Sequence, residues 1–299
     1  RWFVDGQTNI VYNALDRWMN TDIKNKTALI WVAQPFDSAQ GKDLSERKFT
    51  YKQLNDEVSK FANGLKSLGV KKGDKITIYL PRIPEQFNAM LACLKIGAVH
   101  SVVYSGFSSD ALKNRIEDAQ AKIVICANSY PYGKKVIESK KNVDEALKEN
   151  KTVQHVIIVE RIKTGILSEA STDGKRHETG PVFSWWHDLI AKQSSVCPTE
   201  IMESSDPAFI LYTSGTTGKP KGIIHGHGGY MVGIYATLKF VFDINPDDIF
   251  WSTADAGWIT GHSYILYSPL INGITTFVYE GTPDFPDIEV WWRLIDRYK

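Results

Sequence analysis

The first regular pattern along the chain is a helix with a defined beginning and end. Thr50 and Gln53 have the spacing of a capping box, in which each side chain bonds to the backbone N–H of the other residue. Apolar residues then recur at helical spacing until Gly69, which favours a helix end; they are Leu54, Val58, Ala62, Leu65 and Leu68. This pattern predicts an amphipathic helix.

After this helix, short apolar runs alternate with segments of helical period. The runs predict buried strands at residues 76–80, 101–104, 123–127 and 156–159. The intervening segments predict helices at residues 85–96, 108–118 and 142–150, the second capped by Ser108 or Ser109. Strands and helices in alternation predict the α/β class, a mostly parallel sheet covered by helices on both faces.

A second alternating unit follows a polar connector at residues 163–177. Its predicted strands are residues 209–213, 222–225, 249–252 and 275–279, and its predicted helices are residues 229–242, 263–271 and 288–298. We therefore expect two mostly parallel, helix-covered βαβ subdomains, at residues 49–200 and 201–299, preceded by a lead-in segment at residues 1–48. Because the sequence stops inside the last predicted helix, we expect the natural protein to continue.

The composition is that of an ordinary globular protein, with 43% hydrophobic and 23% charged residues. The formal net charge of +1 favours neither nucleic acid nor an anionic membrane as a partner. Cys93, Cys126 and Cys197 lie far apart and suit reduced thiols, and no apolar stretch reaches the ~18 residues of a membrane span. These features predict a cytoplasmic protein, and none predicts an oligomeric state.

One segment carries the candidate chemistry, the run Tyr-Thr-Ser-Gly-Thr-Thr-Gly-Lys-Pro-Lys-Gly at residues 212–222. Its glycines let the backbone approach a phosphate closely, its hydroxyls add donors, and Lys219 and Lys221 add positive charge. The run is not a Walker A loop, because Pro220 follows the first lysine. A polar hairpin turn is the alternative interpretation, and a polyphosphate site is the functional one.

The whole run resembles, without a gap, the phosphate loop of the adenylate-forming enzymes. Further segments are similar to the AMP-forming acetyl-CoA synthetases among them: residues 255–264 (Asp-Ala-Gly-Trp-Ile-Thr-Gly-His-Ser-Tyr), 91–108, 240–243 and 279–283. The resemblance extends from Trp2 to the last residue. It implies the large N-terminal domain of that family, incomplete at its C-terminal end.

The resemblance also implies roles for individual residues. The loop would surround the β- and γ-phosphates of ATP with Thr213, Ser214, Gly215, Thr216, Thr217, Gly218, Lys219 and Lys221. Trp258, Ile259 and Thr260 would line the acyl pocket, with Trp258 limiting chain length, although by itself Trp258 suits a core aromatic. The coenzyme A site would include Tyr104, Ser105, Gly106, Tyr132, Gly133, Lys134, Lys135, Thr260 and Asp284.

Two positions depart from the family pattern. Where acetyl-CoA synthetases commonly carry arginines that bind the 3′-phosphate of coenzyme A, this sequence has Tyr-Gly-Lys-Lys at residues 132–135. Lysine binds phosphate as a point charge without the two-pronged geometry of arginine, so coenzyme A binding is expected to be weaker or differently arranged. Lys134 and Lys135 also suit a solvated charge pair, and Asp284 stands where an amide is more usual.

Three histidines invite a metal interpretation that the sequence does not support. His225, His227 and His262 have no carboxylate or cysteine at a spacing that would complete a ligand set. We therefore expect no protein-bound metal. Mg²⁺ would instead arrive with ATP and keep mostly phosphate and water ligands.

The resemblance implies a ligase that acts on small molecules: ATP, coenzyme A and acetate or another short carboxylate. The carboxylate would form an acyl-adenylate, and the coenzyme A thiol would then displace AMP. Propionate and 3-hydroxypropionate remain alternative substrates, and a catalytically silent nucleotide- or coenzyme A-binding subunit that needs a second chain is the alternative of another class. Because the ribose-binding aspartate and the C-terminal lysine of the family have no counterpart here, we expect residues 1–299 alone to be inactive.

Overall fold

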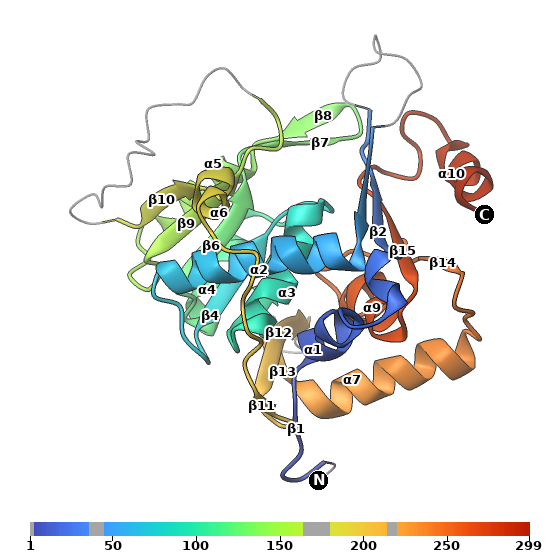
Figure 1. Cartoon of the computed structure of the whole chain (residues 1–299). Coiled ribbons are helices and arrows are strands. Elements are labelled where there is room, and N and C mark those ends of the chain that lie inside the picture. The colour runs from blue at the N-terminus through green and yellow to red at the C-terminus, as the bar shows by residue number, and fades with distance from the viewer. Residues whose placement is uncertain (1–2, 36–44, 164–179, 214–219) are drawn as a thin grey trace.

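A computed structural model describes residues 3–35, 45–163, 180–213 and 220–299 (Figure 1). Most of the predicted polar connector at residues 163–177 lies outside the described residues. So do the six central residues of the predicted phosphate loop, Ser214, Gly215, Thr216, Thr217, Gly218 and Lys219. The α/β prediction is confirmed, since helices cover sheets whose strands are mostly parallel.

The larger sheet has seven strands in the described part of the chain, in the order β10-β9-β6-β4-β5-β12-β13. Each neighbouring pair is parallel except β12 and β13, which are antiparallel. The strands are β10 (Val182–Trp185), β9 (His155–Val159), β6 (Ile123–Ala127), β4 (Lys75–Tyr79), β5 (Val99–Val102), β12 (Pro207–Thr213) and β13 (Lys221–Gly226).

Alternate residues of the central strands point to opposite faces, and different helices cover the two faces. Ile76 and Ile78 share a core with α2 (Tyr51–Ser67) and α3 (Pro84–Lys95). Tyr79 and Val124 share another with α4 (Ser109–Ala119) and α5 (Ser139–Leu147). This period-2 division of buried side chains explains why the central strands read as continuous apolar runs.

The predicted capping box is confirmed. The Thr50 hydroxyl accepts a hydrogen bond from the Gln53 N–H at 3.1 Å, and the Gln53 side chain accepts one from the Thr50 N–H at 2.8 Å. Gly69, which follows the C-cap residue Leu68, has φ of +82°, a backbone conformation that favours glycine.

A second sheet has the order β14-β15-β2-β3. Its strands are β14 (Ile249–Trp251), β15 (Thr275–Tyr279), β2 (Thr27–Val32) and β3 (Glu46–Thr50), so the segment expected to be a lead-in supplies β2 and the first part of β3. α10 (Val290–Tyr298) packs against this sheet. β12 and β13, from the second expected subdomain, join the first sheet, so both sheets combine strands from different expected parts of the chain. The three-part division of the chain remains a prediction.

Besides the short 3-10 helices Asp16–Trp18 and Asp22–Asn25, further elements connect and cover these sheets. They are β1 (Gln7–Thr8), which pairs with β11 (Met202–Glu203), α1 (Ile10–Ala14), α6 (Trp186–Ala191) and the hairpin of β7 (Tyr130–Tyr132) and β8 (Lys135–Ile137). α7 (His227–Ala236) continues into a π-helical stretch, Thr237–Val241. α8 (Ile259–Gly261), π-helical His262–Tyr267 and α9 (Ser268–Asn272) form one continuous helical segment.

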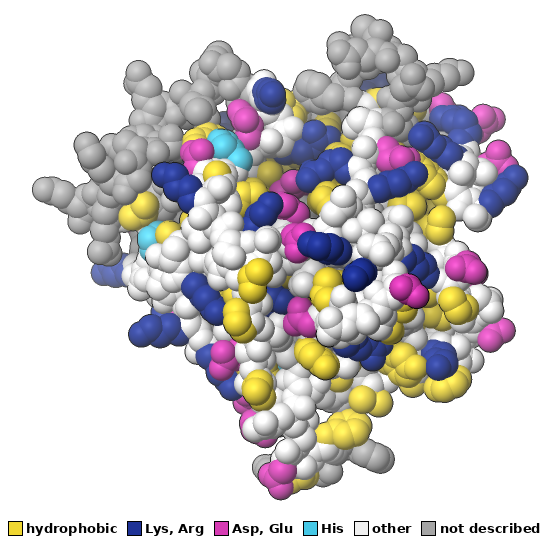
Figure 2. Space-filling model, viewed as in Figure 1, with side chains coloured by type: hydrophobic (Ala, Val, Ile, Leu, Met, Phe, Trp, Pro, Cys, Tyr) yellow, Lys and Arg dark blue, Asp and Glu magenta, His cyan; other side chains and the backbone are white. Residues whose placement is uncertain are grey.

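The surface agrees with the near-zero net charge. On the face shown in Figure 2, lysine and arginine side chains are interspersed with aspartate and glutamate side chains. The three cysteines are free and buried. Within the described ranges, the helices are too short or too polar to cross a membrane.

Candidate active site: two cavities that share Trp258

The candidate site lies where strands of both sheets end. Pro81 and Arg82 follow β4, Tyr104 follows β5, and Thr253 follows β14. Because β12 runs parallel to β5, its last residue, Thr213, is brought to the same edge. Ligands of open α/β sheets commonly bind outside the carboxyl ends of parallel strands.

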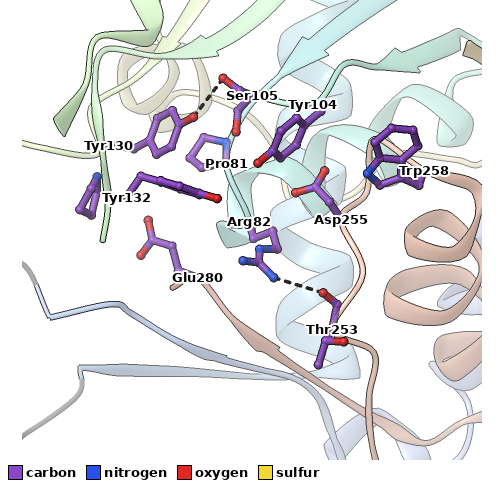
Figure 3. A pocket seen from close by; sticks show the side chains of 11 residues that line it. Pro81, Arg82, Tyr104, Ser105, Tyr130, Tyr132, Thr253, Asp255, Trp258 and Glu280 are labelled. Atoms are coloured by element: carbon purple, nitrogen blue, oxygen red, sulfur yellow. Dashed lines mark hydrogen bonds between the residues drawn. The ribbon is translucent and has the colours of Figure 1, made fainter. Parts of the chain in front are cut away.

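The first cavity has a volume of about 340 Å³, and we call it the tyrosine cavity (Figure 3). Three tyrosines and several polar side chains surround it. Its lining residues are Pro81, Arg82, Tyr104, Ser105, Tyr130, Pro131, Tyr132, Thr253, Asp255, Trp258 and Glu280.

The second cavity has a volume of about 670 Å³, and we call it the strand-end cavity. It is lined by Leu211, Tyr212, Thr213, Ile223, His225, Gly257, Trp258, Ile259 and Thr260. Trp258 lines both cavities, so the two spaces share one wall residue.

The structure brings together many of the residues that the sequence singled out. Thr213 lies in the strand-end cavity with the three residues expected at the acyl pocket, Trp258, Ile259 and Thr260. Thr213 also pairs with Lys221 across β12 and β13, which places the two described ends of the predicted phosphate loop opposite each other. Lys221 is exposed and does not line either cavity.

The residues expected to bind coenzyme A divide into three groups, and Thr260, in the strand-end cavity, stands apart from the other two. Tyr104, Ser105 and Tyr132 line the tyrosine cavity, and Gly106 packs against Tyr104, since a Cβ at Gly106 would lie 2.5 Å from the Tyr104 ring. Outside the lining are Gly133, Lys134, Lys135 and Asp284. Both lysines are exposed, Lys134 in the turn of the β7–β8 hairpin and Lys135 at the start of β8, and Asp284 is exposed after β15.

Trp258 does not have the environment of a core aromatic. Its side chain is 51% exposed, and that of Ile259 is 43% exposed. The Trp258 ring meets Phe107 edge to face, with centroids 6.3 Å apart and an interplanar angle of 81°. An aromatic side chain held at a cavity wall is suited to contact a bound molecule.

Charged side chains gather at one side of the tyrosine cavity (Figure 3). The Arg82 guanidinium donates to the carbonyl oxygens of Gly281 at 2.8 Å and Thr253 at 3.5 Å. Burial raises the pKa of the Asp255 carboxyl, while the Gly257 N–H and the positive charge of Arg82 oppose that shift.

Glu280, buried at the end of β15, forms a two-pronged pair with Arg161. The distances are 2.8 Å from Nε to Oε1 and 2.6 Å from Nη2 to Oε2. Burial raises the pKa of Glu280, and the Arg161 guanidinium opposes the shift. With its charge matched in this way, Glu280 is suited to hold backbone in place more than to bind a cation.

The tyrosines offer ring faces and hydroxyl groups. Burial, and secondarily the proximity of Tyr132 and Asp255, raises the pKa of Tyr104 to about 12, so its phenol keeps its proton at neutral pH. The Tyr130 hydroxyl donates to the Ser105 carbonyl at 3.0 Å. Such walls can stack on a planar base and hydrogen-bond to its edge.

A stack of rings supports the strand-end cavity. The His225 ring lies on Phe209 with centroids 4.7 Å apart and an interplanar angle of 17°, and His262 and His100 lie close to the same ring. Burial lowers the pKa of His225 and lowers that of His262 to about 3. These imidazoles are therefore neutral at pH 7 and pack as aromatic side chains.

Sequence reasoning missed Arg82, Tyr130 and Glu280 as cavity residues, and it considered His225 only as a metal ligand. A usable signal was present for two of them. Arg82 comes two residues after a predicted strand and Glu280 directly after another, and polar residues at the carboxyl ends of parallel strands are natural site candidates.

Comparison with known proteins adds a family to this geometry. The model of the AMP-binding enzyme family matches residues 15–299. The chain is 46% identical over 298 residues to an acetyl-coenzyme A synthetase of Methanothrix thermoacetophila, and 48% identical over 300 residues to one of Pasteurella multocida. It is 47% identical over 299 residues to one of Deinococcus radiodurans. Each alignment covers 100% of this chain but only 43–44% of the relative, so the chain spans less than half the length of these proteins.

Proposed function

Because the chain belongs to the family of AMP-binding enzymes, we propose that the protein joins acetate to coenzyme A with ATP, through an acyl-adenylate and with release of AMP. The observation that carries this proposal is the placement of Trp258, which lines both the cavity at the phosphate-loop strand and the cavity with the tyrosines. The named relatives, acetyl-coenzyme A synthetases that match the full length of the chain, support acetate as the substrate.

The strand-end cavity is the proposed place of the first half-reaction. There a carboxylate oxygen of acetate attacks the α-phosphorus of ATP, a P–O bond forms, and pyrophosphate leaves with the electron pair of the broken bond. Thr213 and Lys221 flank the loop that would hold the triphosphate, together with Ser214, Gly215, Thr216, Thr217, Gly218 and Lys219. Mg²⁺ enters with ATP as part of the substrate.

The same cavity is proposed to select the carboxylate by size. The Trp258 ring and the β-branched Ile259 side chain line it, and Thr260 lies beside them. A pocket that accepts or rejects one methylene discriminates by ~1–3 kcal/mol. These walls therefore favour acetate over longer carboxylates.

The tyrosine cavity is the proposed place of the adenosine end of coenzyme A. Tyr104 and Tyr132 offer ring faces for the adenine, and Ser105 and Gly106 form the adjoining backbone. Lys134 and Lys135 at the hairpin turn, with Gly133 between them and Tyr132, would meet the phosphates as exposed point charges. The coenzyme A thiol then attacks the acyl carbon, a C–S bond forms, AMP leaves, and the thiol proton passes to solvent.

The decisive experiment measures the two half-reactions of the intact protein separately. Acetate-dependent exchange of radioactive pyrophosphate into ATP reports the first, and coenzyme A-dependent release of AMP reports the second. We expect both, with acetate preferred. Binding of ATP and coenzyme A without exchange would overturn the proposal in favour of a silent binding subunit.

A further inference from the structure

The β7–β8 hairpin that supplies Tyr132 is joined to the two sheets in different ways. Its base continues from β6 of the larger sheet, where Asn128 accepts the Ser129 N–H at 2.7 Å and the Arg161 N–H at 3.0 Å. Its tip reaches across toward the end of β2 in the smaller sheet (Figure 1). The tip is therefore the part of the cavity wall whose position depends on contacts between the sheets.

At the tip, a single side chain, that of Gln34, makes two hydrogen bonds to the hairpin. The Gln34 amide nitrogen donates to the Gly133 carbonyl oxygen at 2.8 Å, and the Gln34 side-chain oxygen accepts the Gly133 N–H at 3.0 Å. Gln34 is only 2% exposed, so these bonds are largely shielded from competing water. Gly133 has φ of +57°, and nothing lies within 4 Å of where its Cβ would stand, so no neighbour fills that side of the residue.

The backbone of Gln34 is itself held by the ion pair of Glu280 and Arg161. The Gln34 N–H donates to the Glu280 carboxylate, which is bound by Arg161. The Glu280 N–H donates to the Val32 carbonyl at 3.0 Å. The chain of contacts thus runs from Arg161 through Glu280 and Gln34 to Gly133, and every link is a hydrogen bond.

We propose that Gln34 is a positioning residue for coenzyme A, because it fixes the hairpin tip and thereby sets Tyr132 and the two lysines against the bound nucleotide. This inference rests on the proposed function of the tyrosine cavity. Both side-chain hydrogen bonds of Gln34 go to Gly133, and among the described residues neither Gln34 nor Gly133 lines the strand-end cavity. Its loss should therefore affect the second half-reaction and spare the first.

The test replaces Gln34 with methionine, which keeps the length of the side chain and removes both bonds, and with alanine. In the intact protein, losing the pair should raise the KM for coenzyme A by about three- to tenfold, the range expected from a lost hydrogen bond. Acetate-dependent pyrophosphate exchange should stay at the wild-type rate. Hydrogen exchange of the peptide that contains Gly133 should become faster in both variants.

Two controls separate the possible failures. Asn63→Leu also removes two side-chain hydrogen bonds, more exposed ones, to the carbonyls of Ser194 and Val196 at 2.9 and 3.0 Å. Asn63 lines neither cavity, so this variant should leave the KM for coenzyme A unchanged. Tyr132→Ala tests the cavity itself. A normal KM in the Gln34 variants with a raised KM in Tyr132→Ala would overturn the role of Gln34 alone.

The remaining outcomes are equally decisive. A normal KM in the Gln34 and Tyr132 variants together would overturn the proposed use of the tyrosine cavity, and the role of Gln34 with it. Equal losses in both half-reactions, or a raised KM in Asn63→Leu, would show a general loss of folding and would also contradict the proposal. Slower pyrophosphate exchange with a normal KM for coenzyme A would show that Gln34 acts in the first half-reaction, which contradicts the proposal.

Discussion

The two cavities share Trp258, but their walls differ in charge and in origin. Among the described residues, the lining of the strand-end cavity contains no lysine, arginine or carboxylate, and it comes from β12, β13 and residues 257–260. The tyrosine cavity contains Arg82, Asp255 and Glu280 and is assembled from the ends of several strands in both sheets.

This difference bears on how each cavity would recognise a molecule. A neutral wall such as that of the strand-end cavity discriminates mainly by shape, and its cation for a polyphosphate must come from the loop that joins β12 and β13. A wall with matched charges and three tyrosines depends on hydrogen bonds and on keeping distant segments in register. The following predictions separate the two kinds of recognition.

The largest effect is expected in the phosphate loop. Lys219→Ala in the intact protein removes a charge-assisted contact to the triphosphate, which typically contributes ~1.5–3 kcal/mol. Acetate-dependent pyrophosphate exchange should fall by at least about tenfold. Lys221 is exposed at the start of β13, opposite Thr213. Pyrophosphate exchange in Lys221→Ala shows whether the second lysine of the loop also contributes. Wild-type exchange in Lys219→Ala would refute the assignment of this loop.

The next effect concerns substrate size at the strand-end cavity. Ile259→Ala enlarges the space beside Trp258, and each additional methylene accepted should be worth ~1–3 kcal/mol. We expect wild-type protein to prefer acetate, tolerate propionate and nearly exclude butyrate, and the variant to relax that order. Relative kcat/KM for the three acids measures this, with Val232→Ala on exposed α7 as a control outside both cavities. A wild-type preference for hexanoate or an aromatic acid would contradict the shape argument.

Acidification should weaken the support of the strand-end cavity. Burial lowers the pKa of His262 to about 3 and that of His227 to about 4, whereas an unfolded histidine titrates near 6.5. The unfolded state therefore binds protons first, and stability should be lost as the pH falls from about 6.5 toward 4. Protonation of each such histidine in the unfolded state should lower the free energy of unfolding by about 2 kcal/mol between pH 7 and pH 5.

Urea unfolding at several pH values measures this loss. The fall in the free energy of unfolding between pH 7 and pH 5 should be smaller in His262→Phe than in the wild type. The phenylalanine keeps a ring in the stack but cannot take a proton. His187→Phe serves as the control, since His187 is exposed beside Asp188. An unchanged fall in His262→Phe would show that His262 does not limit acid stability.

The smallest effect is expected at the hairpin turn. Lys134→Ala/Lys135→Ala should raise the KM for coenzyme A by about two- to fivefold, because exposed charge pairs are weak. Pyrophosphate exchange should be unaffected, and the effect should shrink with added salt. A double variant indistinguishable from wild type at low salt would favour the interpretation of these lysines as a solvated pair.

Local patterns were sufficient to predict the elements that carry much of the strand-end cavity. The apolar run before Thr213 predicts a strand, and Trp258-Ile259-Thr260 belongs to a continuous motif, so residues close in sequence stay close in space. The capping box at Thr50 and the strand at residues 123–127 were predicted for the same reason. Each can be recognised from the types and spacing of residues a few positions apart, although the strands themselves pair with remote segments.

Sheet membership and the tyrosine cavity were decided by the tertiary structure. The apolar run at β2 could pair with any strand of similar character, and its pairing with β15, about 250 residues away, required the folded chain. Gln34 and Gly133 are 99 positions apart, and an amide beside a glycine has no periodicity that would reveal the contact. Hydrogen bonds between remote backbone and side-chain groups leave no local pattern in the sequence. The sequence therefore predicts the segments that build each cavity wall, while the pairing of the strands decides which walls meet.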